Sequence, residues 1–343
     1  MRASLIAFTE RGGALADRAA AELERLGWRA DAARGWGEGK RELRAWTAEA
    51  FAGSDALVFV GAAGICVRAV APHVVSKLTD PAVLVLSEDG RFVIPLLSGH
   101  VGGANALART LADRLGAVCV TTTATDTRHL FAVDVWAKSQ GLAILNPGRI
   151  KRVSGKLLAG GTVRLYSDWP VAGKAPRGVE PVPEGPCDVR VTAGTGDAGE
   201  ALILVPRALA LGVGTRRGVA AEAVERTVRA ALAESGYRME AVSGVFSIDL
   251  KKDEPGLLAF CAARSLPFET FPAEALNALP GTFSGSDFVK TTAGTDCVCE
   301  RSAVLGARGG PLRVRKYAAD GVTAAAAEQA VSLQFEEETA WED

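Results

Sequence analysis

The sequence predicts an α/β protein with an N-terminal open, largely parallel sheet, a small middle α/β region carrying a proline- and glycine-rich loop, and a separate C-terminal α/β domain. Short continuous apolar runs alternate with amphipathic helical stretches, which is the pattern of parallel strands covered on both faces. At about 100 to 200 residues per domain, 343 residues make two or three domains. We expect an N-terminal domain at 1–130, a variable middle region at 131–208, a C-terminal domain at 209–332 and an acidic tail at 333–343.

The N-terminal domain is predicted from the alternation of its apolar runs. In order, the expected elements are a strand at 3–8, a helix ending at Gly27, a strand at 57–60, a helix at 64–70, strands at 83–86 and 92–94, a helix at 104–115 and a strand at 118–120. The segment Glu88-Asp89-Gly90 predicts a tight hairpin between two of these strands, because Asp-Gly accepts the positive φ of such a turn.

The middle region keeps helix and strand patterns up to residue 166 and loses them between 167 and 186. Five prolines and three glycines fall in that stretch, and proline supplies no backbone donor, so we expect an extended loop. Patterns resume with a strand at 203–205. The C-terminal domain is then expected to contain a strand at 209–213, a helix with its apolar stripe at 224–232, and further elements at 245–250, 257–263 and 312–314.

Charge and cysteine content exclude several classes of protein. The 39 basic and 40 acidic side chains nearly cancel, so no overall charge draws the chain to nucleic acid or to an anionic membrane. The six scattered cysteines are typical of thiols in a reducing compartment, and the histidines are too dispersed for a metal site. The N-terminal apolar run is too short for a signal peptide, and no stretch reaches the ~18 apolar residues of a membrane span. We expect a cytoplasmic protein.

The densest candidate site is the glycine-rich segment 95–105, which leads into the helix at 104–115. Glycines let a ligand approach the backbone, and a helix start offers amides to a carboxylate or phosphate. His100 stands in the middle of the segment and is a candidate acid or base. The alternative is an inert glycine-rich connection. The candidate ligand-binding residues here are Ser98, Gly99, Gly102, Gly103 and Asn105.

A second small-residue turn follows the strand at 57–60 and contains Gly61, Gly64 and Arg68. Because ligands bind beyond the carboxyl ends of parallel strands, we expect this turn and the 95–105 segment to face one crevice. Lys77 and Asp80 would supply charge near it. The alternative is that these charged residues are a solvated helix face and loop.

The run at 121–126 places hydroxyls and one carboxylate after the strand at 118–120. Thr122 is a candidate ligand for substrate oxygens and Asp126 a candidate base. An N-cap and turn cluster explains the run equally well.

The C-terminal domain opens with a glycine turn at 212–218. Its spacing is GxGxxxG rather than GxGxxG, which argues against a dinucleotide site. We expect Arg216 and Arg217 at a helix N-terminus, where the helix dipole disfavours cations unless an anionic ligand binds there, with Gly214 beside them. Lys251 and Lys252 are either solvated or enlarge the same basic surface.

Four segments together resemble one known family. They are the stretch 61–108, TTTATD at 121–126, LGVGTRRG at 211–218 and LKKDEPGL at 250–257. In this order they resemble the cobalt-precorrin-5A hydrolase family (CbiG-type) of anaerobic cobalamin biosynthesis, over roughly residues 1–330. The chain departs from the family at Thr215, a position that we associate with cysteine in many relatives. We expect this threonine to cap the following helix.

The resemblance implies a substrate and a reaction. The substrate is a cobalt-containing tetrapyrrole with acetate and propionate carboxylates and a δ-lactone on its ring A acetate. Water opens the lactone, and a two-carbon fragment leaves as acetaldehyde, giving cobalt-precorrin-5B. The cobalt arrives in the substrate, so no cofactor or metal of the protein's own is expected.

For that reaction we expect His100 to act as acid and base and the amides of Gly102 and Gly103 to face the oxyanion, with Lys77, Asp80 and Asp126 in reserve. The basic C-terminal residues would hold the substrate's carboxylates. A non-catalytic corrinoid carrier is the alternative. A homodimer and transient contacts with neighbouring methyltransferases of the pathway are left open.

Overall fold

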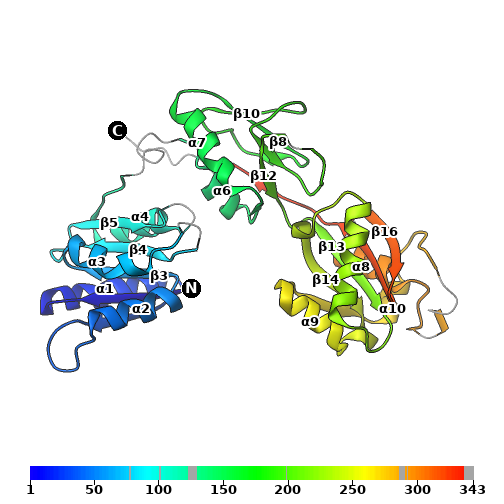
Figure 1. Cartoon of the computed structure of the whole chain (residues 1–343), viewed down its shortest axis with the longest axis horizontal. Coiled ribbons are helices and arrows are strands. Elements are labelled where there is room, and N and C mark those ends of the chain that lie inside the picture. Colours follow the sequence, from blue (N-terminus) through cyan, green and yellow to red (C-terminus); the bar gives the residue numbers. More distant parts are fainter. Residues whose placement is uncertain are drawn as a thin grey trace. The chain divides into compact units, whose positions relative to one another are not determined.

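The computed structural model describes residues 1–76, 79–99, 102–122, 130–197, 199–285, 290–291 and 293–335. The chain divides into two compact units, Met1–Val135 and Trp136–Asp343 (Figure 1). Among the described residues, no helix is both long enough and apolar enough to cross a membrane.

The N-terminal unit is an open six-stranded sheet with helices on both faces, as predicted. Strands β1 to β4 are parallel to their neighbours, β5 runs antiparallel to β4, and β6 is parallel to β5. In sheet order the strands are β2 (Arg29–Arg34), β1 (Arg2–Ala7), β3 (Ala56–Val60), β4 (Ala82–Leu86), β5 (Phe92–Leu97) and β6 (Val118–Cys119).

Successive side chains of these strands point to opposite faces, and each face is covered by two helices. Leu5 packs with the helices α1 and α4, whereas its neighbour Ile6 packs with α2 and α3. The helices of this unit are α1 (Glu10–Arg25), α2 (Leu43–Gly53), α3 (Ala63–Val70), the 3-10 turn η1 (Ala71–His73) and α4 (Ala104–Leu115). Neither β2 nor α2 was predicted, because the edge strand RADAAR contains no continuous apolar run.

The predicted hairpin joins β4 to β5. Gly90 adopts φ +74°, and its amide donates a hydrogen bond to the carbonyl of Ser87 at 2.8 Å. As a result β5 returns along β4, and Leu97 at its end pairs with Val83 near the start of β4. The carboxyl end of β5 therefore lies at the sheet edge where β3 and β4 begin.

The middle region contributes its own five-stranded sheet to the second unit. In sheet order the strands are β10 (Val179–Pro181), β8 (Val163–Ser167), β11 (Val189–Val191), β12 (Leu202–Val205) and β7 (Ala143–Ile144). Its helices are α6 (Val133–Ser139), the 3-10 turn η2 (Pro147–Arg149) and α7 (Ile150–Leu158). The stretch 167–186, predicted as an extended loop, contains the two short strands β9 (Val171–Ala172) and β10.

The prediction of an acidic tail at 333–343 is wrong for residues 333–335. Strand β18 (Leu333–Gln334) pairs in parallel with β9. Leu333 and Phe335 are buried, and the Phe335 ring stacks on Trp136 with centroids 5.6 Å apart. The acidic residues that follow in the sequence suggested a solvated tail, so the burial of Leu333 and Phe335 was not predicted. Residues 336–343 lie outside the described part of the chain.

The C-terminal region forms a third sheet, in which strands β13, β14 and β15 are parallel and β17 and β16 are antiparallel to their neighbours. Helices α8 and α9 cover one face and α12 covers the other. In sheet order the strands are β15 (Phe268–Phe271), β14 (Val242–Ile248), β13 (Leu209–Thr215), β17 (Val322–Glu328) and β16 (Leu312–Ala319). The helices are α8 (Ala221–Glu234), η3 (Met239–Ala241), η4 (Asp249–Lys251), α9 (Pro255–Arg264), α10 (Ala273–Asn277) and α12 (Val298–Gly306).

The middle and C-terminal sheets are distinct, but hydrogen bonds tie them within one unit. The indole of Trp169 donates to Glu328 at 2.9 Å, and the guanidinium of Arg238 donates to the carbonyl of Gly194 at 2.8 Å.

Candidate functional site

The predicted residues of the N-terminal unit lie at two opposite edges of its sheet. Gly61 follows the carboxyl end of β3, and Arg68 lies in the helix that starts there. Ser98 follows β5, whose end is paired with the beginning of β4. The expectation that both loops face one crevice is therefore wrong. Because the hairpin reverses the direction of β5, the carboxyl end of β5 and the loop that follows it lie at the edge opposite to the carboxyl ends of β3 and β4.

The edge at the end of β5 brings together several predicted residues. The hydroxyl of Ser98 donates to the carbonyl of Asp80 at 2.9 Å. Thr122 follows β6, which runs parallel to β5 and so leads toward the same edge. Lys77, His100 and Asp126 lie outside the described residues.

Close contacts and left-handed backbone angles in the segment after β5 explain why glycines occur there. Ser98 adopts a left-handed φ of 56° and Gly103, the N-cap, one of 82°. A Cβ on Gly102 would overlap Ser98 Cβ and lie 2.7 Å from the Ser98 carbonyl oxygen. A Cβ on Gly99 would lie 2.7 Å from Oδ1 of the buried Asn105. We call residues 98–105 the Ser98 loop.

The helix start is only partly free, in contrast to the prediction. The amide of Ala104 donates to the Ser98 carbonyl at 3.1 Å, and that of Asn105 to the Gly99 carbonyl at 2.9 Å. Within the described part of the chain, the amides of Gly102 and Gly103 have no acceptor. These two amides are the donors that the loop can offer to a ligand.

Asp80 is 8% exposed, and its carboxylate holds a turn. Its Oδ2 accepts hydrogen bonds from the amides of Val75 and Ser76, both at 3.0 Å. Its own carbonyl accepts the Ser98 hydroxyl. These contacts favour a role in positioning the Ser98 loop over the acid or base role that the sequence predicted.

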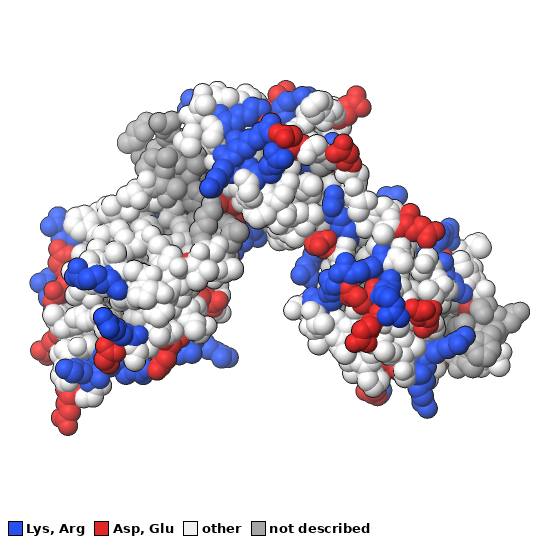
Figure 2. Space-filling model, in the orientation of Figure 1, with Lys and Arg blue, Asp and Glu red and all other residues white. Residues whose placement is uncertain are grey.

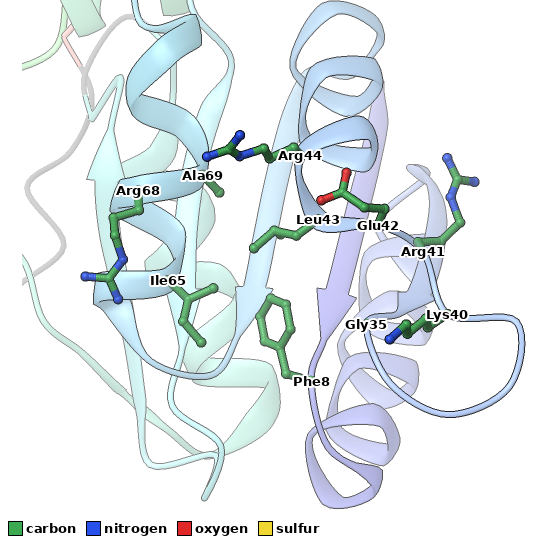
Figure 3. Close-up of a pocket in the computed structure, with 10 residues that line it drawn as sticks. All are labelled: Phe8, Gly35, Lys40, Arg41, Glu42, Leu43, Arg44, Ile65, Arg68 and Ala69. Carbon is green, nitrogen blue, oxygen red and sulfur yellow. The ribbon is translucent and has the colours of Figure 1, made fainter.

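The opposite edge carries a hollow with a volume of about 510 Å³ (Figure 3). Gly61 adopts φ 150° there, and a Cβ on it would lie 3.1 Å from the Phe8 ring. Of the lining residues, the sequence singled out only Arg68. Six of the others were missed because they lie in and around the unpredicted β2 and α2, although Lys40, Arg41 and Arg44 form a basic cluster in sequence; Phe8, Ile65 and Ala69 lie in segments that were predicted but not assigned to a site. The residues lining the hollow are Phe8, Gly35, Lys40, Arg41, Glu42, Leu43, Arg44, Ile65, Arg68 and Ala69.

In the C-terminal region, the structure brings the two predicted basic segments together. The amide of Gly218 donates to Oε1 of Glu254 at 2.6 Å. Oε2 of the same buried carboxylate pairs with Nζ of Lys251 at 3.1 Å. Gly256 is packed so closely that a Cβ would overlap the Val219 carbonyl oxygen. Glu254 thus links the glycine turn to the lysine segment at the carboxyl ends of β13 and β14.

Three details of this turn differ from the prediction. Gly214 lies inside β13, where a Cβ would come within 2.7 Å of the Thr323 hydroxyl oxygen, so it serves packing between strands. Helix α8 starts only at Ala221, so Arg216 and Arg217 lie in the preceding turn and do not oppose the helix dipole. Thr215 does not cap that helix. Its hydroxyl oxygen is buried without a hydrogen-bond partner among the described residues.

The basic side chains of this edge differ in their availability. Arg216, Arg217 and Lys252 are exposed and form no ion pair with any described residue. Lys251 is engaged by Glu254. The first three are therefore the cations that can meet an anionic ligand.

The start of α12, which the sequence did not predict, lies at the same edge beside Gly214. Here the hydrogen bond from Arg301 lowers the pKa of Asp296. The two thiols at its first turn are 4.0 Å apart and 1% exposed. Their hydrogen bond lowers the pKa of Cys297 and, with burial, raises that of Cys299 well above its usual range. No group of three metal-binding side chains occurs among the residues that the structure describes.

Acidic and basic side chains are interspersed over much of the face shown in Figure 2, in keeping with the near-zero net charge. Basic side chains gather over α7. Arg149 and Arg152 both pair with Glu200 there, and Lys156 pairs with Asp188. Two carboxylates therefore offset part of the charge of this cluster.

Comparison with known proteins links all three regions to one pathway. Three family models match, described as cobalamin synthesis G N-terminal (residues 45–126), cobalamin biosynthesis central region (131–205) and cobalamin synthesis G C-terminus (209–327). A cobalt-precorrin-5A hydrolase of Salmonella typhimurium is 35% identical over 284 residues, covering 76% of this chain and 78% of the relative. One from Priestia megaterium is 29% identical over 287 residues, 78% and 76% of the two chains.

A crystal structure of a cobalamin biosynthesis protein G homologue from Sulfolobus solfataricus is also similar. It is 21% identical, with a TM-score of 0.42, over 96% of this chain and 97% of that one.

Proposed function

The chain belongs to the cobalt-precorrin-5A hydrolase family of cobalamin biosynthesis, and from this premise we propose that it opens the ring A δ-lactone of cobalt-precorrin-5A. The observation that carries the proposal is the 35% identity to the Salmonella typhimurium hydrolase across 76% of the chain. The same name on the Priestia megaterium relative supports it. These names do not favour a non-catalytic carrier.

The proposed reaction consumes one water and gives cobalt-precorrin-5B and acetaldehyde. Water adds to the lactone carbonyl, the acyl–oxygen bond breaks, and the ring A acetate becomes a free carboxylate. The hydroxyl released by ring opening then loses its proton and becomes the carbonyl oxygen of acetaldehyde as a carbon–carbon bond breaks. The bonding electrons pass to the macrocycle, which takes up a proton. The cobalt stays in the substrate throughout, so we assign no cofactor to the protein.

We place the lactone at the Ser98 loop. The acceptor-free amides of Gly102 and Gly103 are suited to an oxyanion, since fixed backbone donors stabilise developing negative charge without reorganisation. His100 lies between Gly99 and Gly102 in sequence, and we assign it the transfer of protons to and from water and the leaving hydroxyl. Lys77 and Asp126 stay in reserve for this role.

Exposed cations of the C-terminal region are suited to the substrate's peripheral carboxylates. Arg216, Arg217 and Lys252 have no carboxylate partner among the described residues. Lys251 and Glu254 would support this surface by fixing the turn that carries the arginines.

We place the reaction in the cytoplasm. All six cysteines, each within the described part of the chain, are free thiols, as a reducing compartment maintains them. Dimer formation and contacts with neighbouring methyltransferases stay predictions.

Isotope labelling tests the proposed bond changes. The protein is incubated anaerobically with cobalt-precorrin-5A in oxygen-18 water, and the corrinoid product is analysed by mass spectrometry. We expect cobalt-precorrin-5B with one labelled oxygen in its ring A acetate carboxylate. An unlabelled acetate in that product would exclude attack of water on the lactone carbonyl, and recovery of unchanged substrate would favour a carrier.

A further inference from the structure

The hollow at the carboxyl ends of β1 and β3 lies where the chain order of the sheet reverses. From β1 the chain passes through α1 to β2 on one side, and from β2 through α2 to β3 on the other side of β1. In open α/β sheets, such a switch point is where the loops diverge and leave a crevice for ligands. Phe8, directly after β1, and Ile65, in the first turns of α3, are both among its lining residues.

Unpaired positive charge distinguishes this hollow. Lys40, Arg44 and Arg68 are exposed and form no salt bridge with any described residue, although the amides of Ala45 and Arg44, together with the charge of Arg44, lower the pKa of Glu42. Figure 3 shows Arg44 extending from α2 toward Ala69 of α3. Arg41 instead pairs with Glu49 at 2.6 Å. One acidic residue, Glu42, lines the hollow, and its carboxylate accepts the amide of Ala45 at 2.8 Å. The hollow therefore has an excess of positive charge.

The remaining lining side chains are apolar. Phe8 and Leu43 lie next to one another between α3 and the start of α2, with Ile65 at the edge of α3 (Figure 3). A volume of about 510 Å³ is within the usual range of small-molecule sites, which combine apolar walls with a few polar anchors. An apolar floor beneath free guanidinium and ammonium groups suits an organic anion better than a bare inorganic one.

We propose that this hollow is a second ligand site, which binds an organic polycarboxylate through Lys40, Arg44 and Arg68 with its apolar body against Phe8. Because β3 is five residues long, the site is about 16 Å along the strand from the edge that carries the Ser98 loop. Two sources supply such a ligand: the carboxylated side chains of a corrinoid, and a free di- or tricarboxylate. The first source rests on the proposed function and the second does not.

Chemical footprinting of the full-length protein tests the site. Lysines are acetylated with a limiting amount of reagent, and the modification of Lys40 is quantified by mass spectrometry relative to the exposed Lys151. The probes are cobyrinic acid, whose side chains are carboxylates, cobinamide, whose side chains are amides, citrate and inorganic phosphate. We expect cobyrinic acid, citrate or both to protect Lys40, and cobinamide to leave it reactive. Protection by cobyrinic acid identifies the corrinoid source, and protection by citrate alone identifies the free acid. Protection by phosphate alone, or by none of the probes, would overturn the proposal.

Binding by charge-matched variants provides the control. Affinity for the protecting probe is measured by calorimetry for Lys40→Gln/Arg44→Gln/Arg68→Gln and for Arg18→Gln/Arg29→Gln/Arg114→Gln, three exposed arginines of the same unit outside the hollow. We expect the first variant to bind about 100-fold more weakly and the second to bind like the wild type. Equal affinities would overturn the proposal. Acetaldehyde release is followed separately, and its absence from the wild type would count against the proposed function without changing the footprint.

Discussion

Replacing Gly102 with alanine is expected to lower kcat/KM for acetaldehyde release about 100-fold, the cost of a misplacement of about 1 Å at a catalytic loop. A Cβ at this position would overlap Ser98 Cβ and come within 2.7 Å of the Ser98 carbonyl oxygen. That carbonyl accepts the first amide of α4. The loop must open to make room, and the amides of Gly102 and Gly103 move with it. Steady-state kinetics of the purified variant measure the loss.

Gly53→Ala is the matched control in the same unit. Gly53 ends α2, and a Cβ on it would meet nothing within 4 Å. We expect wild-type kinetics from this variant. A Gly102→Ala enzyme that is as active as Gly53→Ala would show that the loop has no part in the reaction.

Gly212→Ala is expected to destabilise the second unit by about 3 kcal/mol, the upper range for overpacking a core. The added Cβ would overlap the carbonyl oxygen of Cys299 and lie 2.6 Å from the amide nitrogen of Ala303. Both atoms belong to the backbone of α12, which cannot turn aside as a side chain does. The helix must therefore lift from β13 and expose part of the core beneath it. Urea unfolding followed by circular dichroism measures the change.

Gly155→Ala supplies a control of opposite sign. This glycine lies inside α7, and a Cβ on it would meet nothing within 4 Å. Alanine favours a helix interior by about 1 kcal/mol over glycine, so the variant should be slightly more stable. If Gly212→Ala unfolds at the same urea concentration as Gly155→Ala, the close packing of α12 on β13 is not as described.

The strands β1, β3 and β4 were predictable because each is buried on both faces and is therefore a continuous apolar run in sequence. Helix α4 was predictable from its apolar stripe and terminal Gly116. Strand β2 and helix α2 were not, because the edge strand has no continuous apolar run and α2 buries only Trp46, Thr47 and Ala50. Because these two elements were not predicted, the hollow was not predicted either, since most of its lining residues lie in and around them.

Residue chemistry in the site was easier to predict than the position of each loop. The sequence left open whether Lys251 and Lys252 are solvated or join the basic surface of the 212–218 turn, and it did not predict that Glu254 links the two segments. The Ser98 loop lies at the opposite edge from the one expected because the hairpin makes β5 antiparallel to β4. The glycines of β13 were interpreted as a ligand turn, but they are needed because α12 and β17 pack closely against that strand.

Acetaldehyde release tests whether the chain hydrolyses cobalt-precorrin-5A at the Ser98 loop. The wild type, His100→Ala and His73→Ala are each incubated anaerobically with cobalt-precorrin-5A, and acetaldehyde is quantified. His73 is the control because its ring lies against Phe51, with centroids 5.7 Å apart, rather than in the loop. We expect release by the wild type and by His73→Ala, and a loss of about 100-fold or more in His100→Ala. No release by the wild type would contradict the hydrolase, and equal release by all three proteins would remove His100 from the mechanism.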